Sequence, residues 1–230
     1  MEIEQYLYDL NDSGEAIVAY KMQSSAGGSV QICNLGASVL SLSLPDSSGA
    51  VRDVASGGCV RGLSGLLDDR ERFGERLWES RVEVNRVVMG LSYEYEGIGI
   101  TAEVIFDFDD DDVLEITYQA VVEPDATFDL THNLRFDLGG STSCELKSEV
   151  VNDNICLIEG AKRGILAEVA ELFCADSGYR IKLLSSQPAL YYNAESCEIA
   201  PVSSPAELLK EGVRFVQKSV YQPIKATREI

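Results

Sequence analysis

Hydrophobic and polar residues alternate along a stretch near the middle of the chain, from Leu130 to Leu138. Leucine, phenylalanine and the only histidine, His132, take every second position there. The positions between them are polar: Thr131, Asn133, Arg135 and Asp137. Because successive side chains of a β-strand point to opposite faces, this period of two predicts a strand with one packed face and one polar face. The polar groups then lie in solvent, in a cleft or in a hydrogen-bonded network, because burial without partners costs free energy.

Short runs rich in β-branched and aromatic residues recur along the chain, separated by turn residues. Residues 15–20 and 29–34 flank a Ser-Ser-Ala-Gly-Gly segment and predict a hairpin, and Leu/Ser alternation from Leu40 to Leu44 predicts the next strand. An antiparallel meander is predicted over residues 81–86, 91–96, 101–107 and 113–122. Residues 164–173 fit either a short helix or an irregular strand. The predicted fold class is all-β, an antiparallel β-sandwich with few or no helices.

Length and charge limit the classes of function. With 230 residues, 45% of them hydrophobic, the chain is expected to form a single domain over residues 1–230. The formal net charge of −19 repels nucleic-acid backbones and anionic membrane surfaces, so neither is expected as a partner. The first residues lack the basic and apolar regions of a secretory signal, and no apolar run approaches the ~20 residues of a membrane span. We therefore expect a cytoplasmic protein.

The sequence contains no metal-binding signature. Its six cysteines form no CxxC pair, so a zinc site is not expected and the thiols are predicted to be reduced core residues. Residues 107–112 carry five aspartates, but they lack the glycine and the terminal glutamate of an EF-hand loop. A solvated hairpin tip is predicted there, with no metal and no cofactor.

Several segments resemble the galactose mutarotase (aldose 1-epimerase) family. LTHNLRFDLGG, beginning at Leu130, is similar to the family strand L-T-N-H-S-Y-F-N-L. The segments 33–37 (CNLGA), 44–46 (LPD) and 52–54 (RDV) resemble its N-terminal signature, and 176–180 with 185–192 resemble D-x-x-S-G-R and T-x-Q-P-x-x-x-x-Y. The resemblance covers nearly the whole chain thinly, with active-site segments missing. It implies a shortened, divergent member with the galactose mutarotase-like supersandwich.

Anomer interconversion needs an acid at the ring oxygen and a base at the C1 hydroxyl. In the family these groups are a histidine and a glutamate, and the resemblance implies Glu198 as the base. One of the two family histidines has no counterpart. The strand register places Asn133 at the position of the acid and leaves His132 with the core residues, whereas a bulge shifting the strand by one residue would complete a His132 and Glu198 pair.

The resemblance also implies residues that bind the sugar. Asn133, Arg135 and Asp137 lie on the polar face of the central strand, where a guanidinium and a carboxylate can hold hydroxyls or a phosphate or pair with each other. The other candidates lie elsewhere in the sequence: Gln187, Trp78 and Arg61. Trp78 could stack on a sugar face or pack in the core.

Three interpretations of function follow. The first is a carbohydrate-binding, aldose 1-epimerase-like protein with reduced or lost mutarotase activity, whose ligand is a monosaccharide or a sugar phosphate. The second is an active aldose 1-epimerase or hexose-phosphate mutarotase that uses His132 and Glu198. The third is a non-catalytic protein-interaction module on the same sandwich. The sequence leaves open whether the protein is an enzyme and whether it forms a homodimer.

Overall fold

The protein is built from β-strands throughout the part that the computed structural model describes. That part comprises residues 1–46, 49–58, 60–61, 73–95, 97–128, 130–152, 154–158, 162–202 and 207–224, with the backbone alone at residues 56–57, 60–61, 95, 128, 148–152 and 207. No α-helix occurs within these ranges, and the one helical segment is a short 3₁₀ turn, Phe73–Glu75. The all-β prediction is therefore confirmed.

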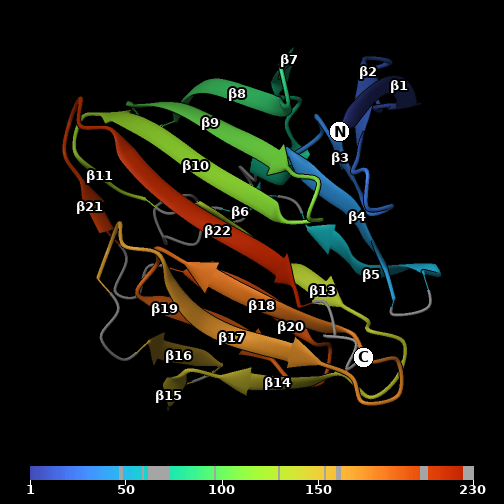
Figure 1. Ribbon diagram of the computed structural model, residues 1–230. Coiled ribbons are helices and arrows are strands. Elements are labelled where there is room, and N and C mark those ends of the chain that lie inside the picture. The colour runs from blue at the N-terminus through green and yellow to red at the C-terminus, as the bar shows by residue number, and fades with distance from the viewer. Residues whose placement is uncertain are drawn as a thin grey trace.

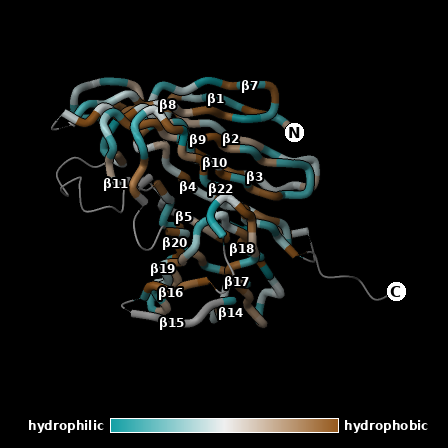
Figure 2. The backbone as a smooth tube through the Cα atoms, turned by 90° about the vertical axis from the view of Figure 1, so that its left-hand side faces the viewer, coloured by the Kyte–Doolittle hydropathy of each residue, from teal (hydrophilic) through white to brown (hydrophobic). Residues whose placement is uncertain are grey.

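Two large antiparallel sheets make up the molecule (Figure 1). The first has ten strands in the order β1-β2-β3-β4-β5-β13-β20-β19-β16-β15. Their bounds are β1 Glu2–Leu10, β2 Ala16–Gln23, β3 Ser29–Cys33, β4 Ser38–Pro45, β5 Val51–Gly58, β13 Leu134–Phe136, β20 Glu198–Val202, β19 Ala189–Asn193, β16 Ile155–Ile158 and β15 Ser148–Asn152. In the view turned by 90°, β4, β5, β20, β19 and β16 follow one another down the molecule (Figure 2).

The second sheet has eight strands in the order β14-β17-β18-β22-β10-β9-β8-β7. Their bounds are β14 Ser143–Leu146, β17 Ala167–Phe173, β18 Arg180–Ser185, β22 Phe215–Pro223, β10 Leu114–Glu123, β9 Ile98–Phe108, β8 Arg86–Tyr95 and β7 Glu79–Glu83. Two short ladders complete the described strands: β11 (Ala126–Phe128) with β21 (Glu207–Leu209), and β12 (Thr131–His132) with β6 (Val60–Arg61).

The hydrophobic pattern predicted several of these strands. The first hairpin is formed by β2 and β3, the Leu/Ser alternation lies in β4, and β7 to β10 form the antiparallel meander. The segment 164–173, for which helix and strand were both open, contributes β17. Strand β1 was not predicted. It lies at the edge of the ten-stranded sheet with most of its side chains exposed, so it lacks the hydrophobic alternation that burial imposes.

The central stretch differs from the single strand that its alternation predicts. The chain forms β12, which pairs with β6, and then β13, which pairs with β5 and β20, and Asn133 lies between them. Thr131, expected on a polar face, is 1% exposed. The open polar face therefore begins only in β13, because β12 leaves the large sheet to pair elsewhere.

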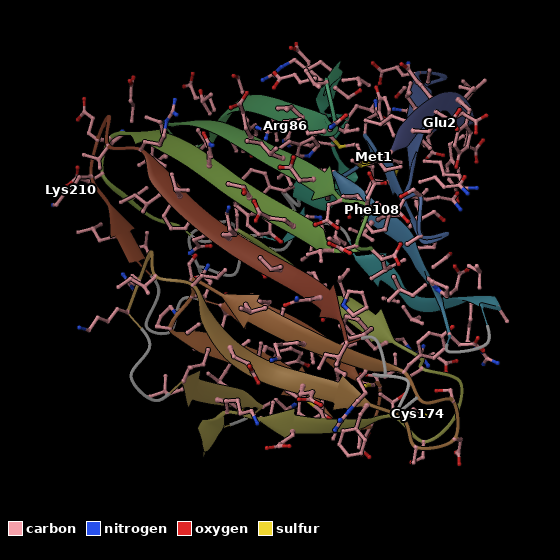
Figure 3. All side chains as sticks on the ribbon, viewed as in Figure 1. Met1, Glu2, Arg86, Phe108, Cys174 and Lys210 are labelled. Atoms are coloured by element: carbon pink, nitrogen blue, oxygen red, sulfur yellow. The ribbon has the colours of Figure 1, made fainter. Side chains whose placement is uncertain are left out.

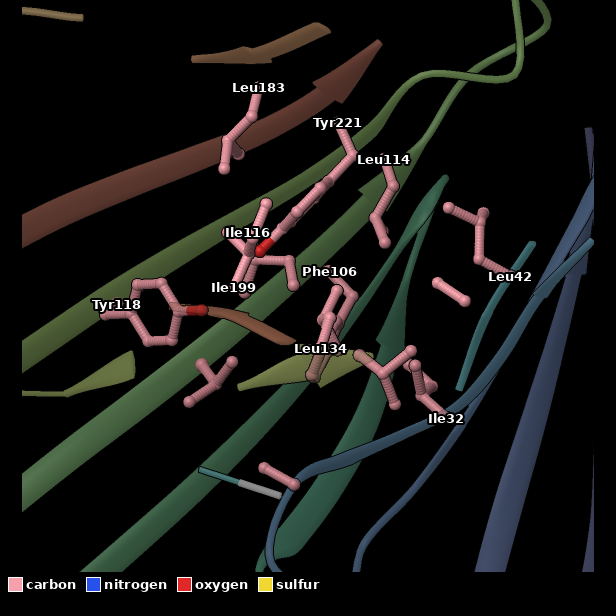
Figure 4. Close-up of a cluster of buried hydrophobic side chains, with 14 of the residues drawn as sticks. Ile32, Leu42, Phe106, Leu114, Ile116, Tyr118, Leu134, Leu183, Ile199 and Tyr221 are labelled. Atoms are coloured by element: carbon pink, nitrogen blue, oxygen red, sulfur yellow. The ribbon is translucent and has the colours of Figure 1, made fainter. Parts of the chain in front are cut away.

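The core lies between the two sheets. Leu134 and Phe136 of β13 and Ile199 of β20 contribute to it from the ten-stranded sheet. They pack in the same cluster as Phe106 and Tyr118 of the eight-stranded sheet (Figure 4). Burial of this kind fixes the register, because a slip by one residue would turn every apolar side chain of β13 outward.

The described cysteines are free thiols. Cys33, Cys156, Cys174 and Cys197 are buried and Cys144 is partly buried. Among the described residues, no helix is long and apolar enough to cross a membrane.

Candidate functional site

The candidate site lies on the face of the ten-stranded sheet that points away from the core. Within β13, Leu134 and Phe136 are buried, whereas Arg135 is exposed. Its direct cross-strand neighbour is Glu198, the first residue of β20. Directly opposed residues of an antiparallel pair have their side chains on the same face. The fold therefore brings together two residues that are 63 positions apart in the sequence.

The polar side chains at this place lack partners among the described residues. Neither the Arg135 nor the Glu198 side chain forms a hydrogen bond or an ion pair with any residue that the structure describes. Asn133 is 9% exposed, and its Oδ1 is buried without a hydrogen bond. For the Asn133 Oδ1 this is costly in an empty site, because buried polar groups are almost always hydrogen-bonded.

These residues belong to a row of polar positions that crosses the sheet. Arg135 pairs with Ser56 on one side and Glu198 on the other, and Glu198 pairs in turn with Asn193. Beyond Ser56 the row continues to Ser41, whose Oγ is also buried without a hydrogen bond. The sequence analysis did not select Ser41 or Asn193. Only the strand pairing reveals them, because each lies far from the central stretch in the sequence.

His132 lies on the opposite side, inside the core. Its side chain is fully buried, and its two ring nitrogens lie 2.8 Å from the Tyr118 hydroxyl and 2.7 Å from the Ala37 carbonyl oxygen. A carbonyl can only accept, so Nε2 carries the proton and Nδ1 accepts from Tyr118. Burial lowers the pKa of His132 to about 4, and the hydrogen bond to Ala37 only partly opposes this shift. The imidazole is therefore neutral at physiological pH.

The central stretch therefore has the register in which His132 faces the core, without the one-residue bulge that would turn it toward Glu198. His132 shares the inward direction of Leu134 and Phe136, and Asn133, not His132, precedes Arg135 on the side of the unpaired groups. The alternative bulge, which would bring His132 beside Glu198, is not present in the described strands β12 and β13. His132 and Glu198, the two expected catalytic residues, are thus not brought together.

Two other expected binding residues have different surroundings. Asp137 is exposed two residues beyond Arg135, and its Oδ1 accepts a 2.8 Å hydrogen bond from the Gly139 amide. It therefore lies on the same face as Arg135, at the end of the strand. Trp78 is 1% exposed and donates from its indole nitrogen to the Phe73 carbonyl at 3.2 Å. Its ring is a core side chain, with no face free to stack on a sugar.

The remaining two candidates lie apart from Arg135 or outside the described side chains. Gln187 is 2% exposed and precedes β19, whereas Asn193 at the other end of β19 pairs with Glu198. The five residues of β19 from Ala189 to Asn193 span about 13 Å in four steps, and Gln187 lines a different cleft. Arg61 pairs through its backbone with Thr131, and its side chain lies outside the described part.

The strand order and this site can be compared with solved structures. A GalM/aldose epimerase homologue from C. elegans superposes with a TM-score of 0.74 and 14% identity, over 90% of this chain and 98% of that chain. Galactose 1-epimerase from Lactobacillus acidophilus gives 0.72 and 11%, over 98% and 99%. The chain has the galactose mutarotase fold. A galactose mutarotase related enzyme from Lactobacillus acidophilus also superposes, with a TM-score of 0.66 and 9% identity, over 92% and 99%.

The galactose mutarotase fold is thus retained with little sequence identity. No protein-family model and no curated protein matches the sequence. At identities of 9 to 14%, these superpositions show a shared sandwich fold. They do not assign a role to any residue of this chain. What this chain does depends on its own groups on the sheet face.

Proposed function

We propose that the protein binds a monosaccharide or a sugar phosphate on the outer face of the ten-stranded sheet, with reduced or lost mutarotase activity. One observation carries the proposal: Arg135 and Glu198 oppose each other across two strands, unpaired among the described residues, beside the buried and unpaired Oδ1 of Asn133. A location in the cytoplasm is part of the proposal, and a homodimer is compatible with it.

Sugar hydroxyls match this set of groups. A hydroxyl both donates and accepts, so one pyranose can donate to the Glu198 carboxylate and the Asn133 Oδ1 and accept from the Arg135 guanidinium. Hydrogen bonds to charged groups are stronger than neutral ones, which gives Arg135 and Glu198 the largest share of the affinity. A phosphate on the sugar would bind Arg135 through two parallel N–H donors.

The proposed loss of activity follows from the missing acid. Glu198 can accept the proton of the C1 hydroxyl, as a base requires. An amide such as Asn133 does not release a proton at neutral pH, and His132 is neutral, fully buried and occupied by Tyr118 and Ala37. Ring opening then lacks general acid catalysis, which typically contributes about 10²- to 10⁴-fold.

Titration of the full chain with glucose, galactose and their 6-phosphates tests binding. Arg135→Gln and Glu198→Gln are expected to weaken the bound sugar at least about ten-fold each, as expected for loss of one hydrogen bond to a charged group. Arg81→Gln and Glu195→Gln are the matched controls, because Arg81 is an exposed arginine of the other sheet and Glu195 is an exposed neighbour of Glu198. Absence of binding by all four sugars would remove the proposal and favour the protein-interaction module.

Saturation-transfer NMR at the anomeric protons tests the activity. The natural chain is expected to give no exchange above the buffer rate. Asn133→His places an imidazole on the side of Glu198 and is expected to raise exchange at pH 7, and the added Glu198→Gln should abolish that gain. Rapid exchange by the natural chain that His132→Gln eliminates would instead establish the active epimerase.

A further inference from the structure

A second cleft, at the end of the molecule that carries β11 and β21, differs in charge from the rest of the protein. It has a volume of about 410 Å³, and its lining includes Arg163, Lys210 and Arg214, with no aspartate or glutamate among the described lining residues. The chain as a whole has 38 acidic and 19 basic residues. Figure 3 shows Lys210 projecting at this end, far from Cys174. The described lining of this cleft therefore carries basic side chains in an otherwise acidic protein.

The walls of the cleft are held by backbone hydrogen bonds. The Gly164 amide donates to the Ser186 carbonyl at 3.2 Å, and the Ser186 amide donates to the Lys218 carbonyl at 3.0 Å. The Ser186 hydroxyl in turn accepts from the Lys218 amide at 2.8 Å. Phe215, which is 6% exposed, contributes an apolar side. A ligand would therefore enter a cleft whose shape is largely formed beforehand.

The three cations are not equivalent. Lys210 donates to Asp125 at 2.7 Å, and this hydrogen bond lowers the pKa of the Asp125 carboxyl. That pair is close to neutral as a unit. Arg214, in contrast, is exposed and makes no hydrogen bond or ion pair with any described residue. Its guanidinium is the group in the cleft that is available for an anion.

We infer that this cleft binds a small multivalent anion carrying phosphate or carboxylate groups, with Arg214 as the principal ligand. The volume falls in the range of small-molecule sites, about 300–1,000 Å³. The rigid N–H fork of arginine matches the geometry of both phosphate and carboxylate oxygens. Gln187 adds an amide to the lining. The inference does not depend on the proposed sugar site, which lies at the other end of β19.

Isothermal titration of the full chain with pyrophosphate and with citrate, at constant ionic strength, tests the inference. At least one anion is expected to bind saturably, and the stronger of the two identifies phosphate or carboxylate as the preferred group. Arg214→Gln is expected to weaken that binding at least about ten-fold. Arg180→Gln and Arg135→Gln are controls that should leave the affinity unchanged, because neither residue lines the cleft.

Two results would overturn the inference. The first is the absence of saturable binding by either anion up to about 10 mM, a weakness that excludes a specific site. The second is binding that Arg135→Gln weakens and Arg214→Gln does not, which would assign the anion to the sheet face and support a sugar phosphate there. Arg214 is exposed, so unchanged thermal unfolding of its variant is expected and verifies that the loss is local.

Discussion

Polar side chains on the inner and outer faces of the central stretch differ in their hydrogen bonding. On the inner face, both ring nitrogens of His132 have partners within 2.8 Å. On the outer face, Arg135 and Glu198 oppose each other, and Asn133 precedes Arg135 by two residues, yet none of these side chains bonds to a described residue. The central stretch thus contains one polar side chain that is held by hydrogen bonds inside the core, and others that make none with the described residues.

The difference indicates which groups are available for a ligand. A buried polar group without partners is normally selected against, since it costs about 1–3 kcal/mol. A buried Asn133 Oδ1 next to the exposed Arg135 is reasonable where a ligand supplies the missing hydrogen bond. The comparison can therefore be tested by removing side chains from each face. Substitutions on the inner face should lower the free energy of unfolding, and substitutions on the outer face should weaken sugar binding.

The largest expected effect is on the inner face. His132→Ala removes a fully buried ring together with its hydrogen bonds to the Tyr118 hydroxyl and the Ala37 carbonyl. The free energy of unfolding should fall by about 3–5 kcal/mol, from the cavity and the lost hydrogen bonds together. Urea unfolding followed by circular dichroism measures the change.

His132→Gln is the milder companion variant, because a glutamine amide can keep one of the two hydrogen bonds. It should fall between the natural chain and His132→Ala. A loss below about 1 kcal/mol for His132→Ala would contradict the structural role assigned to the inner face.

The pH dependence of stability gives the next largest effect. The pKa of His132 is about 4 in the folded chain, below the usual 6.5, so between these values the unfolded chain binds more protons. Stability is therefore lost as the pH falls through this window, by about 2 kcal/mol between pH 7 and pH 5. Urea unfolding at the two pH values measures it. The difference between the natural chain and His132→Gln isolates the histidine, since the carboxylates titrate in both, and equal slopes would show that the imidazole is not buried.

The sequence predicted the inner face well and the outer face only in part. The alternation of Leu134, Arg135 and Phe136 predicts which side chains face the core, because a strand that is buried on one face has hydrophobic residues at every second position. It also assigned His132 to the packed side in the register without a shift. It did not predict the break at Asn133, because pairing of β12 with β6 depends on residues that are distant in sequence.

The partners of the outer face required the fold. Glu198 was selected through a resemblance, but its place directly opposite Arg135 is a matter of strand order, which the sequence does not contain locally. For the same reason Gln187 and Trp78 were assigned to the site, although one lines a separate cleft and the other packs against Phe73. A motif fixes neighbours along the chain, whereas a site on a sheet face is assembled across strands.

A smaller effect is expected where the two faces meet. A Cβ added at Gly58 would lie 2.5 Å from Leu134 Cδ2 and 2.8 Å from the Asn133 carbonyl oxygen, so β5 or β13 must move. Gly58→Ala should cost about 1–3 kcal/mol of stability and weaken sugar binding as well. Gly90→Ala in β8 is the matched control, because its nearest neighbour would be 3.9 Å away. Thermal unfolding and sugar titration of both variants measure the two effects, and equal behaviour of both would show that the contact at Gly58 does not couple the faces.

The smallest effect on stability is expected at Asn133 itself. Its Oδ1 is buried without a hydrogen bond, so Asn133→Ala removes no hydrogen bond to a described residue. The free energy of unfolding should change by less than about 0.5 kcal/mol, or rise, because an uncompensated polar group is removed. Sugar binding should weaken at the same time. A large loss of stability would mean that Asn133 supports the fold as His132 does, and the contrast between the two faces would then disappear.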